Sequence, residues 1–258
     1  MLVLVDIGSS AMKWCACESD KLGAVEAVLY HDVSLQAYCD QMWSSLQTPQ
    51  AVYVSHVGHA DALSAMQEWV TAHWQVPLHE IVALPCFEDV TNAYHVPQQL
   101  GSDRWLNLIA AHILYPGDTV IVDCGSAMTL DVINAAGKHQ GGLIVPGLYR
   151  QQQALYEASP GIQRSLSMTQ GDHDEGMWLG RDTQHALSLG SVYAMAAMID
   201  RVCKMASTQL DSAVQCLLSG ADAATILPHM ECKARHVDNL VLQGLNCVAT
   251  HTEGVAQQ

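Results

Sequence analysis

The feature that most constrains the fold is an internal repeat. The segment Val3–Ser9 (VLVDIGS) recurs as Val120–Ser126 (VIVDCGS), with the central Asp at position 6 and again at position 123. Each copy is an apolar, mostly β-branched run stopped by Asp-x-Gly, which predicts a buried strand that enters a tight turn with the Asp at its end. The repeat indicates two similar halves, 1–117 and 118–258. Two strands of any α/β protein can resemble each other over seven residues by chance. Further motifs are therefore needed to decide whether the chain contains a true repeat.

Apolar periodicity predicts further elements between and after the two copies. Asp61–His73 has the spacing of an amphipathic helix, and so has Ser102–Tyr115, which opens with Ser102 as a capping residue and places Trp105, Leu108, Ile109 and Ile113 on one face. Long helices are expected from Gln151 onward. Extended segments are expected at Ala51–Val57, Ile81–Leu84, Met128–Ile133 and Gln140–Val145. Periodicity alone therefore predicts an α/β protein.

The charge balance restricts the partners. Acidic residues outnumber Lys and Arg by 26 to 11, which gives a net charge of −15, and 50% of the 258 residues are hydrophobic. A chain of this composition can build a large core, and we expect no nucleic-acid partner. An anionic substrate would need individually placed cations, so single Lys and Arg residues become informative.

The cysteines and the first residues indicate a cytoplasmic protein. The nine cysteines are an odd number and contain no Cys-x-x-Cys pair, which favours reduced thiols. Asp6 interrupts the first apolar run, and no uncharged stretch reaches the roughly 20 residues of a membrane span. We therefore expect cytoplasmic residence and no membrane association.

The first Asp-x-Gly segment, Asp6–Lys13, has the parts of a phosphate site. Gly8 permits close backbone approach, Ser9 and Ser10 offer hydroxyls, and Lys13 is a nearby cation. Asp6 would act on phosphate through Mg²⁺, because a carboxylate repels phosphate directly. The spacing is not that of a Walker A loop. The alternative is an ordinary tight turn with a solvated lysine.

The second segment, Asp123–Asp131, places Ser126 and Thr129 hydroxyls between two carboxylates. Together the two segments resemble the motif pair of type III pantothenate kinases, members of the actin-like ATPase superfamily: Asp-x-Gly-Asn-Thr-x-x-Lys/Arg, then Asp-x-Gly-Thr-Ala-x-Thr-x-Asp. Here Ser9-Ser10 replaces Asn-Thr, and Ser126 replaces Thr. The resemblance implies two ribonuclease-H-like α/β halves with an interdomain cleft. It also implies ATP contacts at Asp6, Ile7, Gly8, Ser9, Ser10, Ala11, Met12, Lys13 and Ser126.

Gly101–Arg104 is similar to the Gly-x-Asp-Arg motif of the same family. The resemblance makes Asp103 the catalytic base and assigns Gly101, Ser102, Asp103 and Arg104 to pantothenate. Elementary electrostatics agrees, because the amides of a helix N-terminus stabilise a carboxylate and Arg104 supplies a cation for an anionic substrate. The alternative is an ordinary acidic residue in the first turn of a helix, with Arg104 paired at the surface.

Four further segments follow the family's order. Gly141–Gly147 resembles Gly-Gly-x-Ile-x-Pro-Gly, Gly180–Thr183 resembles Gly-x-x-Thr, Ser219–Ala223 departs from Gly-Gly-Asp-Ala by one alanine, and Asn239–Leu245 matches closely. The resemblance assigns Thr183 to pantothenate. Tyr94, seven residues before Gly101, stands where the family has a substrate-contacting Tyr, although a lone Tyr is more often a packing residue.

The implied reaction is transfer of the ATP γ-phosphoryl group to the pantothenate hydroxyl, the first step of coenzyme A biosynthesis. The resemblance implies Mg²⁺ held through water by Asp6, a monovalent cation (K⁺ or NH₄⁺) at Asp123, and a homodimer. An apolar helical stripe, Met195, Met198, Ile199 and Val202, is then core or subunit contact. Two alternatives stay open: another small-molecule kinase of the superfamily, and a nucleotide-binding regulatory protein without turnover.

Overall fold

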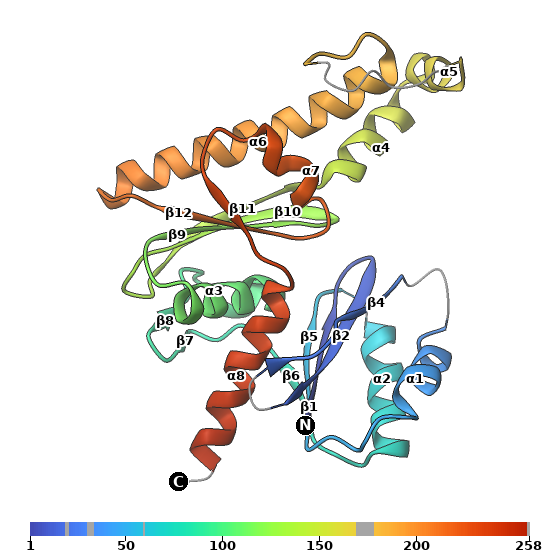
Figure 1. Cartoon of the computed structure of the whole chain (residues 1–258), viewed down its shortest axis with the longest axis vertical. Helices are drawn as coiled ribbons and strands as arrows, with labels where there is room; N and C mark the ends of the chain where they lie inside the picture. Colours follow the sequence, from blue (N-terminus) through green and yellow to red (C-terminus); the bar gives the residue numbers. More distant parts are fainter. Residues whose placement is uncertain (19–20, 30–33, 59, 169–177, 257–258) are drawn as a thin grey trace. The chain divides into compact units, whose positions relative to one another are not determined.

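The computed structural model describes residues 1–18, 21–29, 34–58, 60–168 and 178–256. They form two compact units (Figure 1). The first comprises Met1–Pro116, Ala135–Gly141 and Asn239–Gln258, and the second comprises Gly117–Asn134 and Gly142–Asp238. The chain first passes between units beside Gly117, where the repeat placed the division, but two later segments return to the first unit. The halves 1–117 and 118–258, and a cleft between them, stay predictions.

The first unit is built on a sheet in the order β3-β2-β1-β5-β6, with β4 on the free part of β2. Strands β1 and β2 form an antiparallel hairpin, whereas β5 and β6 continue from β1 in parallel. The apolar runs of β1 and β5 are almost fully buried, as expected for central parallel strands. The strands are β1 (Leu2–Ile7), β2 (Ala11–Glu18), β3 (Lys21–Leu22), β4 (Glu26–Leu29), β5 (Val52–His56) and β6 (Leu78–Ile81).

Helices cover both faces of this sheet (Figure 1). On one face, α1 (Leu35–Trp43) and α2 (Ala60–His73) enclose an aromatic core, in which the ring of Trp43 lies 5.6 Å from Trp14, 5.5 Å from Trp69 and 5.3 Å from Trp74. On the other face lie α3 (Ser102–Leu114) and α8 (Leu240–Ala256). Between α2 and α3 the chain forms β7 (Cys86–Phe87), β8 (Val90–Thr91) and the 3₁₀ turn η1 (Pro97–Gln99).

The C-terminal helix α8 packs closely on α3. A Cβ atom added to Gly244 of α8 would lie 2.2 Å from the carbonyl oxygen of Leu106 in α3, so only glycine permits this approach. At the end of α3, the Tyr115 hydroxyl donates to Oε1 of Gln243 at 2.8 Å. These contacts explain why the last segment of the chain belongs to the first unit.

The second unit repeats the sheet order of the first. Its order is β11-β10-β9-β12-β13, in which β9 and β10 form an antiparallel hairpin and β12 and β13 continue in parallel from β9. The internal repeat therefore marks equivalent hairpins in two sheets, and the predicted α/β fold class is confirmed. The strands are β9 (Thr119–Cys124), β10 (Ala127–Ile133), β11 (His139–Pro146), β12 (Gln215–Ser219) and β13 (Ala234–His236).

The long helix α6 (Thr183–Leu210) lies along one face of the second sheet (Figure 1). By length and composition it is the one helix in the described ranges that could cross a membrane. However, Val192, Met195 and Ile199 pack in the core of this unit, which gives its apolar composition a structural reason. The remaining helices are α4 (Leu148–Ala158), α5 (Pro160–Met168), α7 (Ala223–Ile226) and the 3₁₀ turn η2 (Leu227–His229).

Four details differ from the sequence prediction. The strand expected at Ile81–Leu84 lies earlier, at Leu78–Ile81. Gly101, not Ser102, is the N-cap of α3, because the Ser102 hydroxyl is buried against β5 instead. Ile113 is 40% exposed although it shares the apolar periodicity of α3. Strands β12 and β13 were not foreseen among the helices expected after Gln151.

The cysteines are free thiols, and most of them are buried. Burial raises the pKa of Cys15 and of Cys39 to about 12, because the charged thiolate is poorly solvated there. Thiols with such a raised pKa stay protonated and react slowly at neutral pH.

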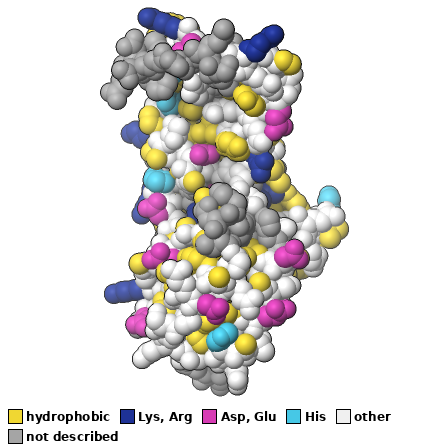
Figure 2. Space-filling model, turned by 90° about the vertical axis from the view of Figure 1, so that its right-hand side faces the viewer, with side chains coloured by type: hydrophobic (Ala, Val, Ile, Leu, Met, Phe, Trp, Pro, Cys, Tyr) yellow, Lys and Arg dark blue, Asp and Glu magenta, His cyan; other side chains and the backbone are white. Residues whose placement is uncertain are grey.

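Charged side chains are dispersed over the face that Figure 2 shows. On the face drawn in Figure 2, Lys and Arg side chains lie singly among Asp and Glu. With a net charge of −15, an anionic substrate depends on cations placed one at a time in its site. Lys13 and Arg104, which lie in the predicted site segments, are therefore the candidate cations.

Candidate functional site: two strand-end turns and the start of α3

The turn between β1 and β2 presents backbone and hydroxyl groups at the end of the first sheet. The backbone N–H of Gly8 donates to the carbonyl oxygen of Ala11 at 3.0 Å, which closes the turn, and the side chains of Ser9 and Ser10 are exposed. By contrast, Ile7 and Met12 are buried in the core. Within the predicted ATP-binding stretch, those two residues can therefore contribute only backbone groups, whereas Ser9 and Ser10 can offer hydroxyls.

Asp6 stands at the end of β1 between two polar neighbours. It is paired with Lys13 across the antiparallel hairpin and with Ser55 across the parallel pair of β1 and β5. Paired residues place their side chains on the same face of a sheet. Asp6 and Lys13 thus share one face of the hairpin, and the carboxylate and the two turn hydroxyls offer the hard oxygen ligands that Mg²⁺ prefers.

The start of α3 is fastened to the same end of the sheet. Oγ of Ser102 lies 3.1 Å from Oγ of Ser55, accepts from the backbone N–H of His56 at 3.1 Å and donates to its carbonyl oxygen at 3.0 Å. Ser55 is also the partner of Asp6 in the parallel register. The first unit therefore brings the Asp6 turn and the Asp103 segment to neighbouring positions at the ends of β1 and β5.

The Asp103 side chain is held at the N-terminus of α3. Its Oδ1 accepts from the backbone N–H of Arg104 at 2.7 Å, and the residue is half-buried. A Cβ atom on Gly101 would lie 2.4 Å from that Oδ1, so a larger residue there would displace the carboxylate. Helix N-terminal amides favour the ionised form, which a proton acceptor needs.

Tyr94 contacts two other side chains of the first unit, the candidate Arg104 and His139. The Arg104 guanidinium donates from Nη1 to the Tyr94 hydroxyl at 2.8 Å, and its central carbon lies 5.6 Å from the ring centroid. The Tyr94 ring also stacks with the ring of His139 of β11, with 6.1 Å between the two centroids. Arg104 is 4% exposed, so its position is fixed by packing as well as by this bond. The arrangement orients a buried cation for an anionic ligand.

The turn between β9 and β10 repeats the first turn in the second unit. The backbone N–H of Gly125 donates to the carbonyl oxygen of Ala127 at 3.1 Å, which closes a turn one residue shorter than the first, where Gly8 donates to Ala11. Asp123 is paired with Thr129 and with Ser219, so the parallel neighbour is again a serine. Where the first hairpin has Lys13, the second has the hydroxyl of Thr129.

Two glycines let other loops pack directly on this second turn. A Cβ atom on Gly147 would lie 2.0 Å from the carbonyl oxygen of Gly125, and one on Gly220 would lie 2.4 Å from that of Cys124. Gly220 also has a φ of +97°, which L side chains rarely adopt. The segments Gly141–Gly147 and Ser219–Ala223 therefore buttress the turn. Burial raises the pKa of the neighbouring Asp222, and a backbone hydrogen bond with Leu148 partly offsets that effect.

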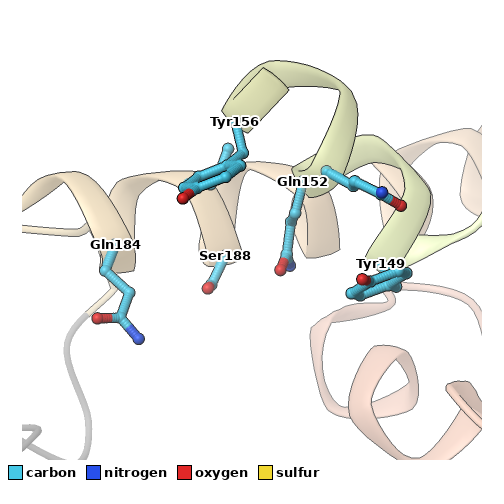
Figure 3. A pocket seen from close by; sticks show the side chains of 7 residues that line it. Tyr149, Gln152, Tyr156, Gln184 and Ser188 are labelled. Carbon is cyan, nitrogen blue, oxygen red and sulfur yellow. The ribbon is translucent and has the colours of Figure 1, made fainter. Parts of the chain in front are cut away.

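Thr183 begins α6, where Asp182 caps the helix by accepting from the backbone N–H of His185 at 2.9 Å. Near the start of α6, an open groove lies between α4 and α6. It is lined by Tyr149, Gln152, Gln153, Tyr156, Gln184, Leu187 and Ser188. Figure 3 shows the polar ends of Gln152, Gln184 and Ser188 on the same side of the two helices. No predicted site residue lines this groove.

The candidate residues thus fall into two groups, each within one unit. Asp6–Lys13, Tyr94 and Gly101–Arg104 belong to the first, whereas Asp123, Ser126 and Thr183 belong to the second. Sequence reasoning missed Ser55 and His139, which hold Ser102 and Tyr94. A serine at the end of a predicted strand was the only signal for Ser55, and no motif marked His139.

Two sheets of the same order, each with an Asp-x-Gly turn at the end of its first strand, define an actin-like ATPase fold. Solved structures agree. A Campylobacter jejuni protein assigned to the Baf family of transcriptional activators has a TM-score of 0.59 at 20% identity, covering 98% of this chain and 99% of that chain. A ROK family glucokinase from Streptomyces griseus, in complex with glucose and AMPPNP, has a TM-score of 0.54 at 11% identity, covering 97% and 99%. These likenesses concern the fold.

Sequence comparison is more specific. The family model described as type III pantothenate kinase matches residues 2–205. The type III pantothenate kinase of Nitrosococcus oceani is 34% identical over 263 residues, which cover 100% of this chain and 97% of the relative, and that of Herminiimonas arsenicoxydans is 34% identical over 262 residues, which cover 98% of each. The chain belongs to the type III pantothenate kinase family, as its motifs predicted.

Proposed function

We propose that this chain transfers the γ-phosphoryl group of ATP to the primary hydroxyl of pantothenate, giving 4′-phosphopantothenate for coenzyme A biosynthesis. Membership of the family supports the reaction. The assignment of residues depends mainly on one observation. Ser102 is hydrogen-bonded to Ser55 at the end of β5, beside the strand that bears Asp6. This contact supports the proposal, because Ser102 precedes Asp103 and Ser55 is the strand partner of Asp6.

Asp103 acts on the hydroxyl that attacks the phosphorus atom. As an ionised carboxylate at the start of α3, it orients the hydroxyl and accepts its proton late in the transfer. Arg104 and Tyr94 bind the pantothenate carboxylate and the neighbouring polar groups, with Gly101 and Ser102 shaping the backbone there. Thr183 is assigned to pantothenate by the family resemblance.

The first turn handles the phosphates of ATP. The turn from Ile7 to Met12 lies against the phosphates, with the hydroxyls of Ser9 and Ser10 and the ammonium group of Lys13 as donors to phosphate oxygens, and Ser126 adds a hydroxyl from the second turn. A kinase of this fold requires a divalent ion such as Mg²⁺, which neutralises charge on the transferring group. Asp6 would hold it through water, in keeping with the reluctance of Mg²⁺ to lose its water ligands.

Asp123 is the proposed ligand of a monovalent cation, K⁺ or NH₄⁺. In the second turn no lysine occupies the place that Lys13 has in the first, because Thr129 faces Asp123. A bound cation would supply the missing positive charge near the anionic nucleotide.

We also propose a cytoplasmic homodimer. Met195 and Ile199 lie in the core of the second unit, so the stripe that includes them does not offer a subunit surface. Instead, exposed apolar side chains gather on and near α4, where Tyr149 is 69%, Leu155 51% and Tyr156 44% exposed. Clustered exposed apolar residues are typical of a protein contact.

A coupled assay that measures ADP release with and without pantothenate tests the activity. We expect ATP turnover to require pantothenate and the product to be one phosphoryl group heavier by mass spectrometry. ATP binding without turnover on any alcohol would favour the regulatory alternative. Turnover with a different alcohol, but not with pantothenate, would favour another kinase of the superfamily.

A further inference from the structure

Three cysteine thiols of the second unit converge beneath α6. Cys203 comes from α6, Cys216 from β12 and Cys232 from the segment before β13. Their Sγ atoms all lie within 4.8 Å of one another, and those of Cys203 and Cys232 are 3.7 Å apart. They form the one such cluster of possible metal ligands within the described ranges of the chain.

The fold explains why residues so far apart in sequence meet. Cys216 alternates with Leu217, so it shares with Leu218 the face of the sheet that α6 covers. Cys203 faces that sheet from the last part of α6. Strand β13 pairs with β12 so that Ala234 is opposite Cys216, which brings Cys232, two residues earlier, to the same place. No spacing rule could have grouped these three positions.

A carboxylate fixes the most exposed member of the cluster. Asp200, three residues before Cys203 on α6, accepts from the backbone N–H of Cys232 at 2.8 Å and from that of Glu231 at 2.9 Å. The loop that carries Cys232 is therefore held to α6 by two directed polar contacts. Groups that orient ligands in this way are a regular part of protein metal sites.

We propose that Cys203, Cys216 and Cys232 bind one Zn²⁺ ion through three thiolates. With Zn–S bonds of about 2.3 Å, two sulfur atoms of a tetrahedral site lie about 3.8 Å apart, close to the separation of Cys203 and Cys232. Cys203 and Cys216 are 6% and 2% exposed, whereas Cys232 is half-buried, so a fourth ligand such as water would enter from the side of Cys232.

Charge favours a divalent ion over a monovalent one. Three thiolates and Zn²⁺ leave one net negative charge, whereas the same thiolates and Cu⁺ leave two. The Asp200 carboxylate beside Cys232 adds another negative charge to this mostly buried place, and uncompensated buried charge is costly. The bound ion would link α6, β12 and the loop before β13.

Zinc binding can be measured directly on the full chain. Reduced, chelator-treated protein is loaded with Zn²⁺, freed of excess metal and analysed for zinc by mass spectrometry, and Co²⁺ is then used to look for sulfur-to-cobalt charge-transfer absorption. We expect one Zn²⁺ per chain. Cys232→Ser, which alters the half-buried ligand, should weaken binding by at least about 100-fold, since even second-shell changes cost 10- to 100-fold.

Cys86→Ser is the matched control, because Cys86 is an exposed thiol of the first unit. It should bind Zn²⁺ like the wild type. Cys203→Ser and Cys216→Ser should also lose the metal, but they alter buried positions, so Cys232→Ser decides. The proposal is overturned if the reduced wild type takes up no zinc, if only Cu⁺ binds, or if Cys232→Ser binds zinc as well as the wild type does. It is also overturned if Cys203 and Cys232 form a disulfide in the isolated protein and reduction does not restore zinc binding.

Discussion

The Arg104 guanidinium and the Tyr94 hydroxyl are joined by a hydrogen bond of 2.8 Å. They are ten positions apart in sequence, and the family resemblance assigned both to pantothenate, with electrostatic support for Arg104. Because Arg104 is buried and Tyr94 also stacks on His139, the bond ties a buried cation to an aromatic wall. A substrate carboxylate at this place would meet an arginine whose direction is already set.

Tyr94→Phe tests that relationship, because it removes the hydroxyl and keeps the ring. A hydrogen bond to a charged group contributes about 1.5–3 kcal/mol, so we expect KM for pantothenate to rise about 10- to 100-fold while KM for ATP changes little. Steady-state kinetics with each substrate varied in turn measures both. Tyr115→Phe is the control, since it loses a hydroxyl bonded to Gln243 at the far end of α3. Equal effects of the two variants on pantothenate would argue against a substrate role for Tyr94.

Asp103→Asn keeps the size of the side chain and removes its charge and basicity. We expect kcat to fall by roughly 10²- to 10⁴-fold, with folding and ATP affinity nearly unchanged, because the proposed phosphate contacts are made by the turns and not by Asp103. Single-turnover kinetics and ATP-binding calorimetry measure the two effects. Asp61→Asn changes an exposed acidic residue in the first turn of α2 and should leave kcat alone. Near-normal phosphorylation by Asp103→Asn would reduce that carboxylate to a helix-terminus charge.

The fold class and the paired turns were predictable because they depend on local patterns. Apolar runs stopped by Asp-x-Gly mark strand ends wherever they occur, and both copies did end strands, β1 and β9. The later strands of the second sheet, β12 and β13, were not predictable in this way. Strand β12 is a short apolar run among helical segments, a pattern that periodicity cannot separate from a buried helix.

The site was predictable as a set of motifs but not as an arrangement. Ser102 looked like a helix cap, yet its hydroxyl bonds to β5, a choice that depends on a strand 47 residues away. His139 carries no motif, and only the return of Ala135–Gly141 to the first unit brings it to Tyr94. Such long-range pairings are set by packing and have no local signal.

Replacing Na⁺ by K⁺ or NH₄⁺ at matched ionic strength should increase turnover, because the monovalent cation proposed at Asp123 would offset the charge of the nucleotide. Asp123→Asn should lower turnover and remove most of the difference between the ions. Asp118→Asn is the control, because Asp118 directly precedes β9 in the same unit. This variant should keep the difference in turnover between the ions. Equal rates of the wild type in all three salts would remove the proposed cation site.

Leu155→Glu should weaken self-association, because it puts a charge on the exposed apolar surface around α4. We expect the wild type to sediment at micromolar concentration with twice its chain mass of 27.9 kDa, and the variant to shift toward one chain mass. Leu114 is 46% exposed in the first unit, so Leu114→Glu is a matched control that should stay dimeric. A monomeric wild type contradicts the dimer, and a dimeric Leu155→Glu contradicts this surface.

Gly244→Ala should destabilise the protein by separating α8 from α3. The new methyl group would lie 2.2 Å from the carbonyl oxygen of Leu106, and backbone in a packed helix pair cannot yield cheaply. Overpacking of this kind costs about 1–3 kcal/mol. The control is Gly190→Ala in α6, another helical glycine, where a Cβ atom would meet nothing within 4 Å. Removing glycine from an open helix position should stabilise by about 0.5–1 kcal/mol. Urea unfolding of the two variants beside the wild type therefore gives shifts of opposite sign if α8 closes on α3 as described, whereas stabilisation by both substitutions would show that the C-terminal helix does not pack there.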